Sequence, residues 1–149
     1  MKLTLLMTID VDLHEPVSMP ATPQGEVRVV PFATGRFEAA EFRGKLLPGG
    51  TDWQRVRLDG VLEIRAHYMF ETDQGERIEV ISEGIRVATP EVLESIARGD
   101  HVPADRYYFR TCVRFNTAAE RLAHLNRMLA ISVGERQNRS VHLELYAVP

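Results

Sequence analysis

Apolar and polar residues alternate along much of the chain, which is typical of strands that are buried on one face. From Leu3 to Leu13 every odd-numbered residue is apolar and most of the even-numbered ones are polar. The same alternation runs from Val61 to Thr72, where the even-numbered residues up to Phe70 are apolar. Because neighbouring side chains of a strand point to opposite sides, both stretches predict half-buried strands.

Shorter segments of the same character predict further strands. These expected strands are Glu26–Val30, Arg36–Leu47, Trp53–Leu58, Arg77–Ile81 with an extension toward Val87, Tyr107–Phe115, Met128–Val133 and Val141–Val148. The stretch from His14 to Gly25 holds three prolines and is expected to be a loop. Turn signals such as Asp59-Gly60 separate neighbouring strands.

Two short helices are expected besides the strands. Thr89 is a good N-cap, Pro90 suits the first helical position and Gly99 suits the stop, so a helix is predicted between them. A second short helix is expected at Ala118–Leu125.

The pattern as a whole indicates an all-β fold. About eight to ten short strands with few helices predict an antiparallel β-barrel with one or two short helices, as a single domain over residues 1–149. Closure is favoured because it removes exposed strand edges. An eight-strand barrel has room inside for a side-chain core or one small ligand.

Composition and charge exclude several classes of function. The 149 residues are 44% hydrophobic and 26% charged, with a net charge of −3. This balance provides neither the basic surface of a nucleic-acid-binding protein nor a polybasic membrane patch. No segment approaches the ~20 apolar residues of a membrane span. Cys112 is the only cysteine and is expected to be a small buried side chain. With no disulfide possible within the chain and no recognisable signal peptide, a cytoplasmic protein is predicted.

Neither a metal nor a cofactor is predicted. The five histidines and one cysteine form no zinc motif, and neither a nucleotide-binding loop nor a serine nucleophile elbow is recognisable. Leu6 is apolar on an otherwise polar face and would suit a homo-oligomer interface, although single exposed apolar residues are common.

The turn from Leu47 to Trp53, with the sequence Leu-Pro-Gly-Gly-Thr-Asp-Trp, is the most distinctive local feature. Paired glycines allow a positive φ and a close approach of the backbone to its neighbours. Asp52 can accept hydrogen bonds from backbone amides, and Trp53 offers an aromatic wall with one N–H donor. The turn either closes the barrel structurally or forms part of a ligand pocket.

Several sequence blocks, in order along almost the whole chain, resemble a known family. They are Leu47–Trp53, Leu58-Asp59-Gly60, Glu71–Gly75, Tyr107–Thr111 with Arg114-Phe115, and Leu125-Asn126-Arg127. Together they are similar to the domain-of-unknown-function family 3237. The resemblance implies a calycin-like β-barrel, somewhat similar to lipocalins, and no common activity.

Four positions depart from the pattern of that family. Asn116 stands where an acidic residue is usual, Leu122 and His124 replace aromatic residues, and His67 stands in place of an arginine. If these positions line a pocket, the resemblance implies that its chemistry differs from that of the relatives.

His67 is a candidate proton carrier. It shares a strand face with Glu63 and Arg65, and this face points either to solvent or into a polar cavity. In a cavity, an imidazole that titrates near neutrality would suit acid–base catalysis or a ligand contact.

Arg110 and Thr111 follow three aromatic residues on one predicted strand. An arginine inside the barrel would pair with Asp52 or Asp59, or bind the carboxylate of a ligand. Asn126 would donate to a ligand carbonyl or cap a turn.

Three classes of function remain open. The first is a protein that binds a small apolar or aromatic carbonyl or carboxylate compound. Its ligand-binding residues would be Trp53, Asp59, Arg110, Thr111 and Asn126. The second is a cofactor-free isomerase, lyase or hydrolase, in which Asp52 or His67 moves a proton and Arg110 or Asn126 stabilises an oxyanion. The third is a structural subunit that acts through oligomer contacts. Convergence of Asp52, Trp53, Arg110 and Asn126 on one cavity would support the first two.

Overall fold

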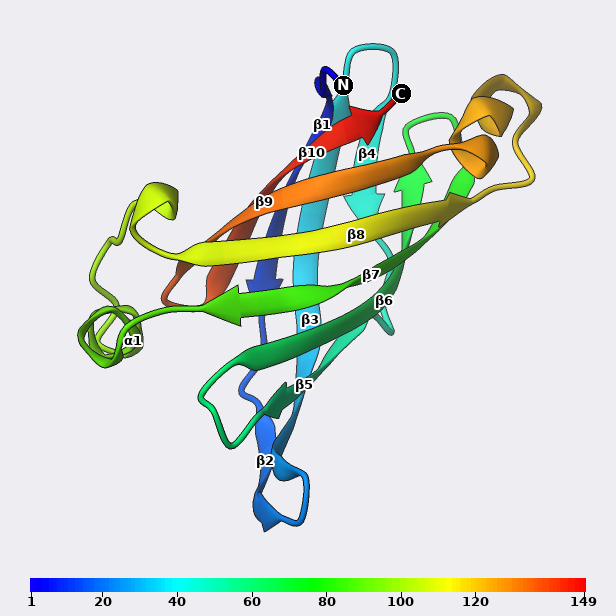
Figure 1. Ribbon diagram of the computed structural model, residues 1–149. Helices are drawn as coiled ribbons and strands as arrows, with labels where there is room; N and C mark the ends of the chain where they lie inside the picture. Colours follow the sequence, from blue (N-terminus) through cyan, green and yellow to red (C-terminus); the bar gives the residue numbers. More distant parts are fainter.

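The computed structural model describes residues 1–149 and consists mainly of antiparallel strands (Figure 1). The strands are β1 (Thr4–Leu13), β2 (Val17–Thr22), β3 (Gly25–Ala39), β4 (Arg43–Leu46), β5 (Thr51–Val56), β6 (Leu62–Thr72), β7 (Arg77–Val87), β8 (Tyr108–Asn116), β9 (Leu129–Gln137) and β10 (Ser140–Val148). The helices are α1 (Pro90–Ala97) and the 3₁₀ helices η1 (Ala104–Arg106) and η2 (Glu120–Arg127).

The strands close into an eight-strand antiparallel barrel, which confirms the predicted fold class. Around the barrel the order is β1, β10, β9, β8, β7 and β6, then β4 and β5 together, then β3, which returns to β1. β4 and β5 share one position because each pairs with β6 on one side and β3 on the other. β2 pairs only with the first part of β3, and the two project from the barrel as a hairpin (Figure 1).

The prediction of a loop from His14 to Gly25 is wrong, because Val17–Thr22 forms strand β2. β2 has a neighbour on one side only, so a proline that lacks an N–H leaves no sheet bond unmade on the other side. The pairing with β3 is interrupted between Met19 and Thr22, next to Pro20. Proline content therefore indicated a loop where the chain forms an edge strand.

Two of the expected strands are parts of one long strand. β3 runs through Pro31 without a break and joins Glu26–Val30 to the first part of Arg36–Leu47, while β4 forms the remainder. The strand changes partner on both sides near the proline, from β2 to β1 on one side and from β5 to β4 on the other. A change of partner therefore accommodates the proline in mid-strand.

The first predicted helix is confirmed with its capping residues. Thr89 accepts a hydrogen bond on its Oγ1 from the backbone N of Val92 at 3.3 Å, and Gly99 follows the helix with φ +84°. α1 lies to one side of the barrel, beyond the end of β7 (Figure 1). No helix in the structure has the length and apolar character needed to cross a membrane.

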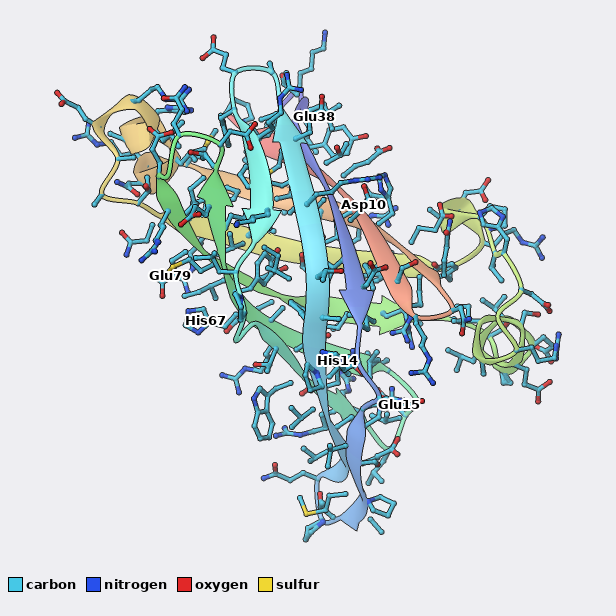
Figure 2. All side chains as sticks on the ribbon, turned by 180° about the vertical axis from the view of Figure 1, so that it is seen from behind. Asp10, His14, Glu15, Glu38, His67 and Glu79 are labelled. Atoms are coloured by element: carbon cyan, nitrogen blue, oxygen red, sulfur yellow. The ribbon has the colours of Figure 1, made fainter.

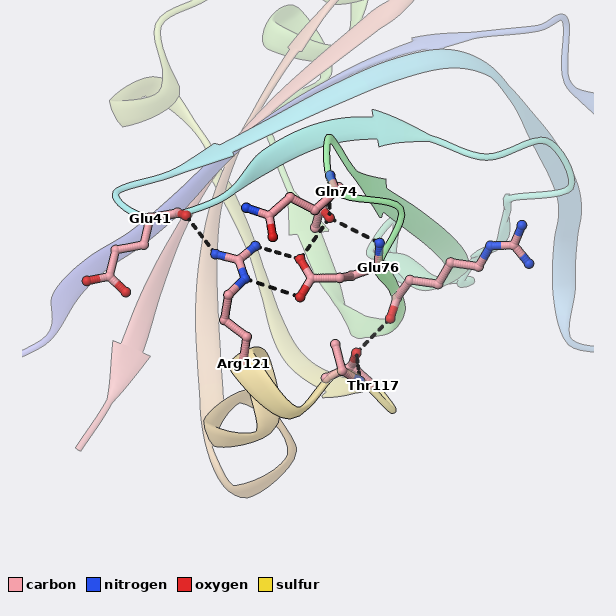
Figure 3. A network of polar contacts seen from close by, with 8 residues as sticks. Glu41, Gln74, Glu76, Thr117 and Arg121 are labelled. Atoms are coloured by element: carbon pink, nitrogen blue, oxygen red, sulfur yellow. Dashed lines mark hydrogen bonds and ion pairs between the residues drawn. The ribbon is translucent and has the colours of Figure 1, made fainter.

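The second predicted helix is η2, which covers one end of the barrel. Leu122 and Leu125 on η2 are fully buried. Arg121 Nε donates to Glu76 Oε2 at 3.1 Å, and Arg121 Nη1 donates to the backbone O of Glu41 at 3.0 Å (Figure 3). These bonds fasten η2 to the β3–β4 and β6–β7 turns, so this end of the barrel is closed.

The core packs against the closed end. The rings of Phe37 and Phe70 stack with their centroids 4.2 Å apart, and Phe42 lies 5.9 Å from Phe37. Met7 and Ile78 are buried in the same cluster. The opposite end, where β7 and β9 finish and β8 and β10 begin, is called the mouth below.

Candidate functional site

A cavity of about 50 Å³ lies inside the barrel. Aliphatic and aromatic side chains from five strands form most of its wall. The polar side chains that line it are Asp52, Gln54, Ser82, Arg86, Thr111 and Arg136. A mostly apolar cavity with a few convergent polar groups has the character of a ligand site.

The Leu47–Trp53 turn directs β5 into the barrel wall. Gly49 has φ +102°, a conformation that side chains rarely adopt. Gly50 lies so close to its neighbours that an added Cβ would be 2.8 Å from Tyr68 Cβ and 2.9 Å from Phe32 Cδ2. Both roles predicted for the paired glycines are therefore present in the turn.

Asp52 points inward from β5 and is 9% exposed. Its Oδ2 accepts from Gln54 Nε2 at 2.7 Å, and its Oδ1 accepts from the backbone N of Arg65 at 3.1 Å. Burial raises the pKa of the Asp52 carboxyl. These hydrogen bonds and the nearby arginine charges favour the ionised form, but burial outweighs them. Asp52 is thus a carboxyl whose proton affinity is increased.

Tyr68 places a phenol in the same cavity. Its hydroxyl is buried and has no hydrogen-bond partner in the protein. Burial raises the pKa of Tyr68, and the charge of Asp52 adds to that effect. The phenol is therefore neutral, and it can donate to a ligand oxygen.

Three hydroxyls form a row across β7, β8 and β9. Ser82 Oγ donates to Thr111 Oγ1 at 2.7 Å, and Thr111 Oγ1 lies 2.6 Å from Ser132 Oγ. All three side chains are buried. The three hydroxyls have hydrogen-bond partners within the row. The first role of the row is therefore to hold β7, β8 and β9 in a fixed position along one another.

Three arginines lie close enough near the mouth for their charges to act on one another. Arg86 Nε is buried without a hydrogen-bond partner. Burial lowers the pKa of Arg86 to about 10, with further lowering by the charges of Arg136 and Arg28. Burial also lowers the pKa of Arg136, and the charge of Arg28 adds to it. Arg28 has Glu26 as a neighbour, with 3.9 Å between Nε and Oε1.

Among the predicted site residues, Asp52 and Thr111 line the cavity, whereas Trp53 and Arg110 point outward. Trp53 is 54% exposed. Arg110 lies over the Tyr108 ring, 5.2 Å from its centroid, and donates from Nη1 to the backbone O of Phe109. Strand alternation explains both cases, because Trp53 follows the inward Asp52 and Arg110 precedes the inward Thr111.

The face that carries Glu63, Arg65 and His67 points away from the barrel interior. His67 Nε2 is 2.8 Å from Glu79 Oε2, and the two side chains lie together on the outside of the barrel (Figure 2). The two orientations left open by the sequence are thereby resolved. Cys112, expected to be buried, is exposed on the outer face of β8.

Asp59 and Asn126 have local partners away from the cavity. Asp59 Oδ1 accepts from Arg57 Nε at 3.1 Å and from the backbone N of Val61 at 3.2 Å in the β5–β6 turn. Asn126 on η2 accepts from the backbone N of Thr117 at 2.7 Å and donates to its O at 2.9 Å.

The four residues whose convergence on one cavity would have supported a ligand or catalytic site do not converge. Asp52 lies inside the barrel, Trp53 and Arg110 lie on its outer face, and Asn126 holds the chain at the closed end. No group of three or more His, Cys, Asp or Glu side chains is gathered closely enough to hold a metal ion.

Sequence reasoning missed Tyr68, Arg86 and Arg136 as site residues. Tyr68 was assigned to the apolar face of its strand, which is correct, but not to the site. Arg86 follows Ser82 and Gly84 on the inner face of β7, and Arg136 follows Ser132 and Gly134 on the inner face of β9. The signal that could have identified the two arginines is a Ser-x-Gly-x-Arg pattern that occurs in both strands. In each strand it follows one or more buried apolar residues on the inner face and ends with the arginine.

Comparison with known proteins agrees with the fold. The family described as "Protein of unknown function (DUF3237)" matches residues 1–148. A UPF0311 protein of Clostridium acetobutylicum is 32% identical over 124 residues, which are 83% of this chain and 78% of that protein. A crystal structure of a conserved protein of unknown function from Rhodopseudomonas palustris matches with a TM-score of 0.94 at 29% identity, covering 99% of this chain and 97% of that one. A beta-barrel like protein from Acinetobacter baumannii matches with a TM-score of 0.85 at 30% identity, covering 99% and 96%. The chain belongs to the DUF3237 family of proteins of unknown function.

Proposed function

We propose that the barrel cavity binds a small, largely apolar compound that carries a carbonyl or carboxylate group. The observation that carries this proposal is the Tyr68 hydroxyl, which is buried against the cavity without a hydrogen-bond partner. A buried donor without a partner costs about 1–3 kcal/mol. A ligand oxygen that accepts from Tyr68 would remove that cost.

The size and lining of the cavity support a compact ligand. About 50 Å³ accommodates a group of only a few heavy atoms, so a larger body would have to extend through the mouth. Apolar side chains such as Val30, Ile64 and Leu143 would contact the hydrocarbon part. Asp52 and Tyr68 would contact the oxygen-bearing part.

Thermal unfolding with small probe compounds tests the proposal. Butanone, isobutyramide and isobutyrate are each added to the protein, and we expect at least one of them to raise the Tm of the wild type. Tyr68→Phe should fold and lose most of that increase, because it removes only the free donor. Tyr108→Phe, which alters an exposed tyrosine on the outer face, is the matched control and should respond like the wild type.

Two results would contradict this function. One is a wild-type Tm that none of the three compounds changes. The other is an increase in Tm that is the same in Tyr68→Phe as in the wild type, which would place the bound compound outside the cavity.

A second candidate function is acid–base catalysis on a small carbonyl compound. It is favoured by one observation, the raised pKa of the Asp52 carboxyl beside the neutral Tyr68 phenol. In this reaction Asp52 would take a proton from the carbon next to the carbonyl, and Tyr68 would donate a hydrogen bond to the developing oxyanion. Arg110 and Asn126 lie too far from the cavity for the oxyanion role predicted from the sequence.

Proton exchange in heavy water tests the catalytic candidate. The protein should accelerate loss of the NMR signal of the butanone protons next to the carbonyl, and Asp52→Asn should remove the acceleration. Equal exchange rates with the wild type, with Asp52→Asn and without protein would exclude this activity for butanone.

A further inference from the structure

We propose that Arg86 and Arg136 form an anion site at the mouth of the barrel, so that the ligand is a small organic acid held by its carboxylate. This inference rests on the proposed binding function and assigns its ligand a charge.

The two arginines are presented by the same five-residue pattern. β7 contains Ser82-Glu83-Gly84-Ile85-Arg86 and β9 contains Ser132-Val133-Gly134-Glu135-Arg136. β7 and β9 are the two neighbours of β8. In each strand the serine, glycine and arginine alternate onto the inner face, and the arginine ends up nearest the mouth.

A shared hydroxyl links both strands to β8. Thr111 on β8 contacts Ser82 at 2.7 Å on one side and Ser132 at 2.6 Å on the other. Each arginine lies four residues beyond its serine. Arg86 pairs with Phe109, and Arg136 lies beyond the last pair of β8 with β9, Arg110 with Val133, so both side chains are carried toward the mouth. Two strands thus deliver two positive charges to one region.

Gly134, in the β9 copy of the pattern, leaves the space that the Phe109 ring occupies. A Cβ added to Gly134 would lie 2.6 Å from Phe109 Cδ2, so the ring packs directly on the backbone of β9. Phe109 lines the cavity and is paired in register with Arg86. An apolar ligand body would pack against Phe109 while its charged end faces the arginines.

Neither arginine has a carboxylate in contact with it. Arg136 Nε donates to the backbone O of Asn138 at 2.9 Å, and the charge of Asp52 acts on both arginines from a distance. Neither Arg86 nor Arg136 takes part in any ion pair of the molecule. Asp52 is the one carboxyl that lines the cavity, and its own hydrogen bonds come from Gln54 and the backbone of Arg65. Arg86 Nε remains buried and unpartnered.

An anion is the ligand chemistry that satisfies this arrangement. Burying a guanidinium without a partner is unfavourable, and the planar N–H groups of arginine match the two oxygens of a carboxylate. Phosphate shares this chemistry, but the walls of the cavity are mainly apolar and favour an acid with a hydrocarbon body. The lowered pKa values of both arginines show that burial and the neighbouring positive charges disfavour the charged guanidinium groups, and a bound anion would offset this effect.

Affinities for a matched pair of compounds test the anion site. Isobutyrate and isobutyramide have the same size and differ in charge, and inorganic phosphate supplies the charge without the hydrocarbon body. Calorimetric titration should give a lower Kd for isobutyrate than for either of the other two. Arg86→Gln and Arg136→Gln should each raise the Kd of isobutyrate by about tenfold or more, because each removes a charged hydrogen bond. Arg110→Gln, an arginine on the outer face of β8, is the matched control and should bind like the wild type.

The outcomes separate this inference from the binding function itself. Equal affinities for isobutyrate and isobutyramide, unchanged in Arg86→Gln and Arg136→Gln, would overturn the anion site while the cavity still binds. Preferred binding of phosphate would overturn the assignment of an organic acid. Binding of neither isobutyrate nor isobutyramide would remove the binding function and the anion site together. If Arg86→Gln does not fold, Arg86→Lys keeps the charge, and a Kd for isobutyrate equal to that of the wild type would contradict the two-oxygen contact.

Discussion

At the scale of single residues, Asp52 shows how burial and hydrogen bonding compete for one carboxyl. The backbone N of Arg65 and the amide of Gln54 stabilise the carboxylate, yet burial raises its pKa. The sequence identified Asp52 through its turn, and it identified Thr111 as a residue behind three aromatics. Arg86 and Arg136 could not be recognised in the same way, because an arginine near a strand end usually points to solvent.

Asp52→Asn should change the pH dependence of stability. A raised pKa in the folded protein means that Asp52 contributes most to stability below about pH 4, near its unfolded pKa. This contribution is lost as the pH rises through the folded pKa, whereas asparagine does not titrate. Measured Tm values from about pH 4 to about pH 8 should therefore fall for the wild type relative to Asp52→Asn. A constant difference between the two proteins would contradict the raised pKa.

At the scale of elements, the alternation of apolar and polar residues predicted most of the strands. It could not predict which strands pair with one another. The inner face of β6 was assigned correctly from Leu62 to Phe70, because every second residue is apolar. β2 was missed, since proline content does not reveal whether a strand lies at an edge. Asp52 and Trp53 are neighbours on β5, so an inward Asp52 requires an outward Trp53. Treating the two residues as one motif suggested that both would face the same site.

Replacement of Gly50 should affect both the packing of the turn and the ligand site. A Cβ at this position would meet Tyr68 and Phe32, so Gly50→Ala should lower the free energy of unfolding by about 1–3 kcal/mol in guanidinium chloride. It should also displace Tyr68 and weaken ligand-dependent stabilisation. Gly49→Ala is the control: nothing lies within 4 Å of its added Cβ, so it strains φ alone and should keep the ligand response. A wild-type ligand response in both variants would contradict the role of Gly50 in positioning Tyr68.

At the scale of the whole molecule, the barrel has a closed end that packs the core and a mouth that carries charge. The number of strands and their alternation were sufficient to predict a closed barrel. They could not predict which strand ends meet at the mouth, because that depends on the order β7, β8, β9 and on their register. The position of Arg86 and Arg136 near the mouth was therefore visible only in three dimensions.

The closed end should dominate stability. Leu122 on η2 is 1% exposed, so Leu122→Ala should cost about 2–4 kcal/mol through lost burial and a residual cavity. Leu93→Ala on α1, where the leucine is exposed, should change the free energy of unfolding by less than about 0.5 kcal/mol. Equal effects of the two substitutions would show that η2 does not seal the core.

The side-chain N–H signals of Arg86 and Arg136 test the central claim most directly. Isobutyrate is titrated into ¹⁵N-labelled protein, and the Nε–H resonances of all arginines are followed by NMR. The structure predicts a saturable shift of the Arg86 and Arg136 signals, accompanied by backbone amides of β7, β8 and β9 near the mouth, with no shift at Arg110. Unmoved Arg86 and Arg136 signals at saturation, or equal shifts with isobutyramide, would contradict an anion site inside the barrel.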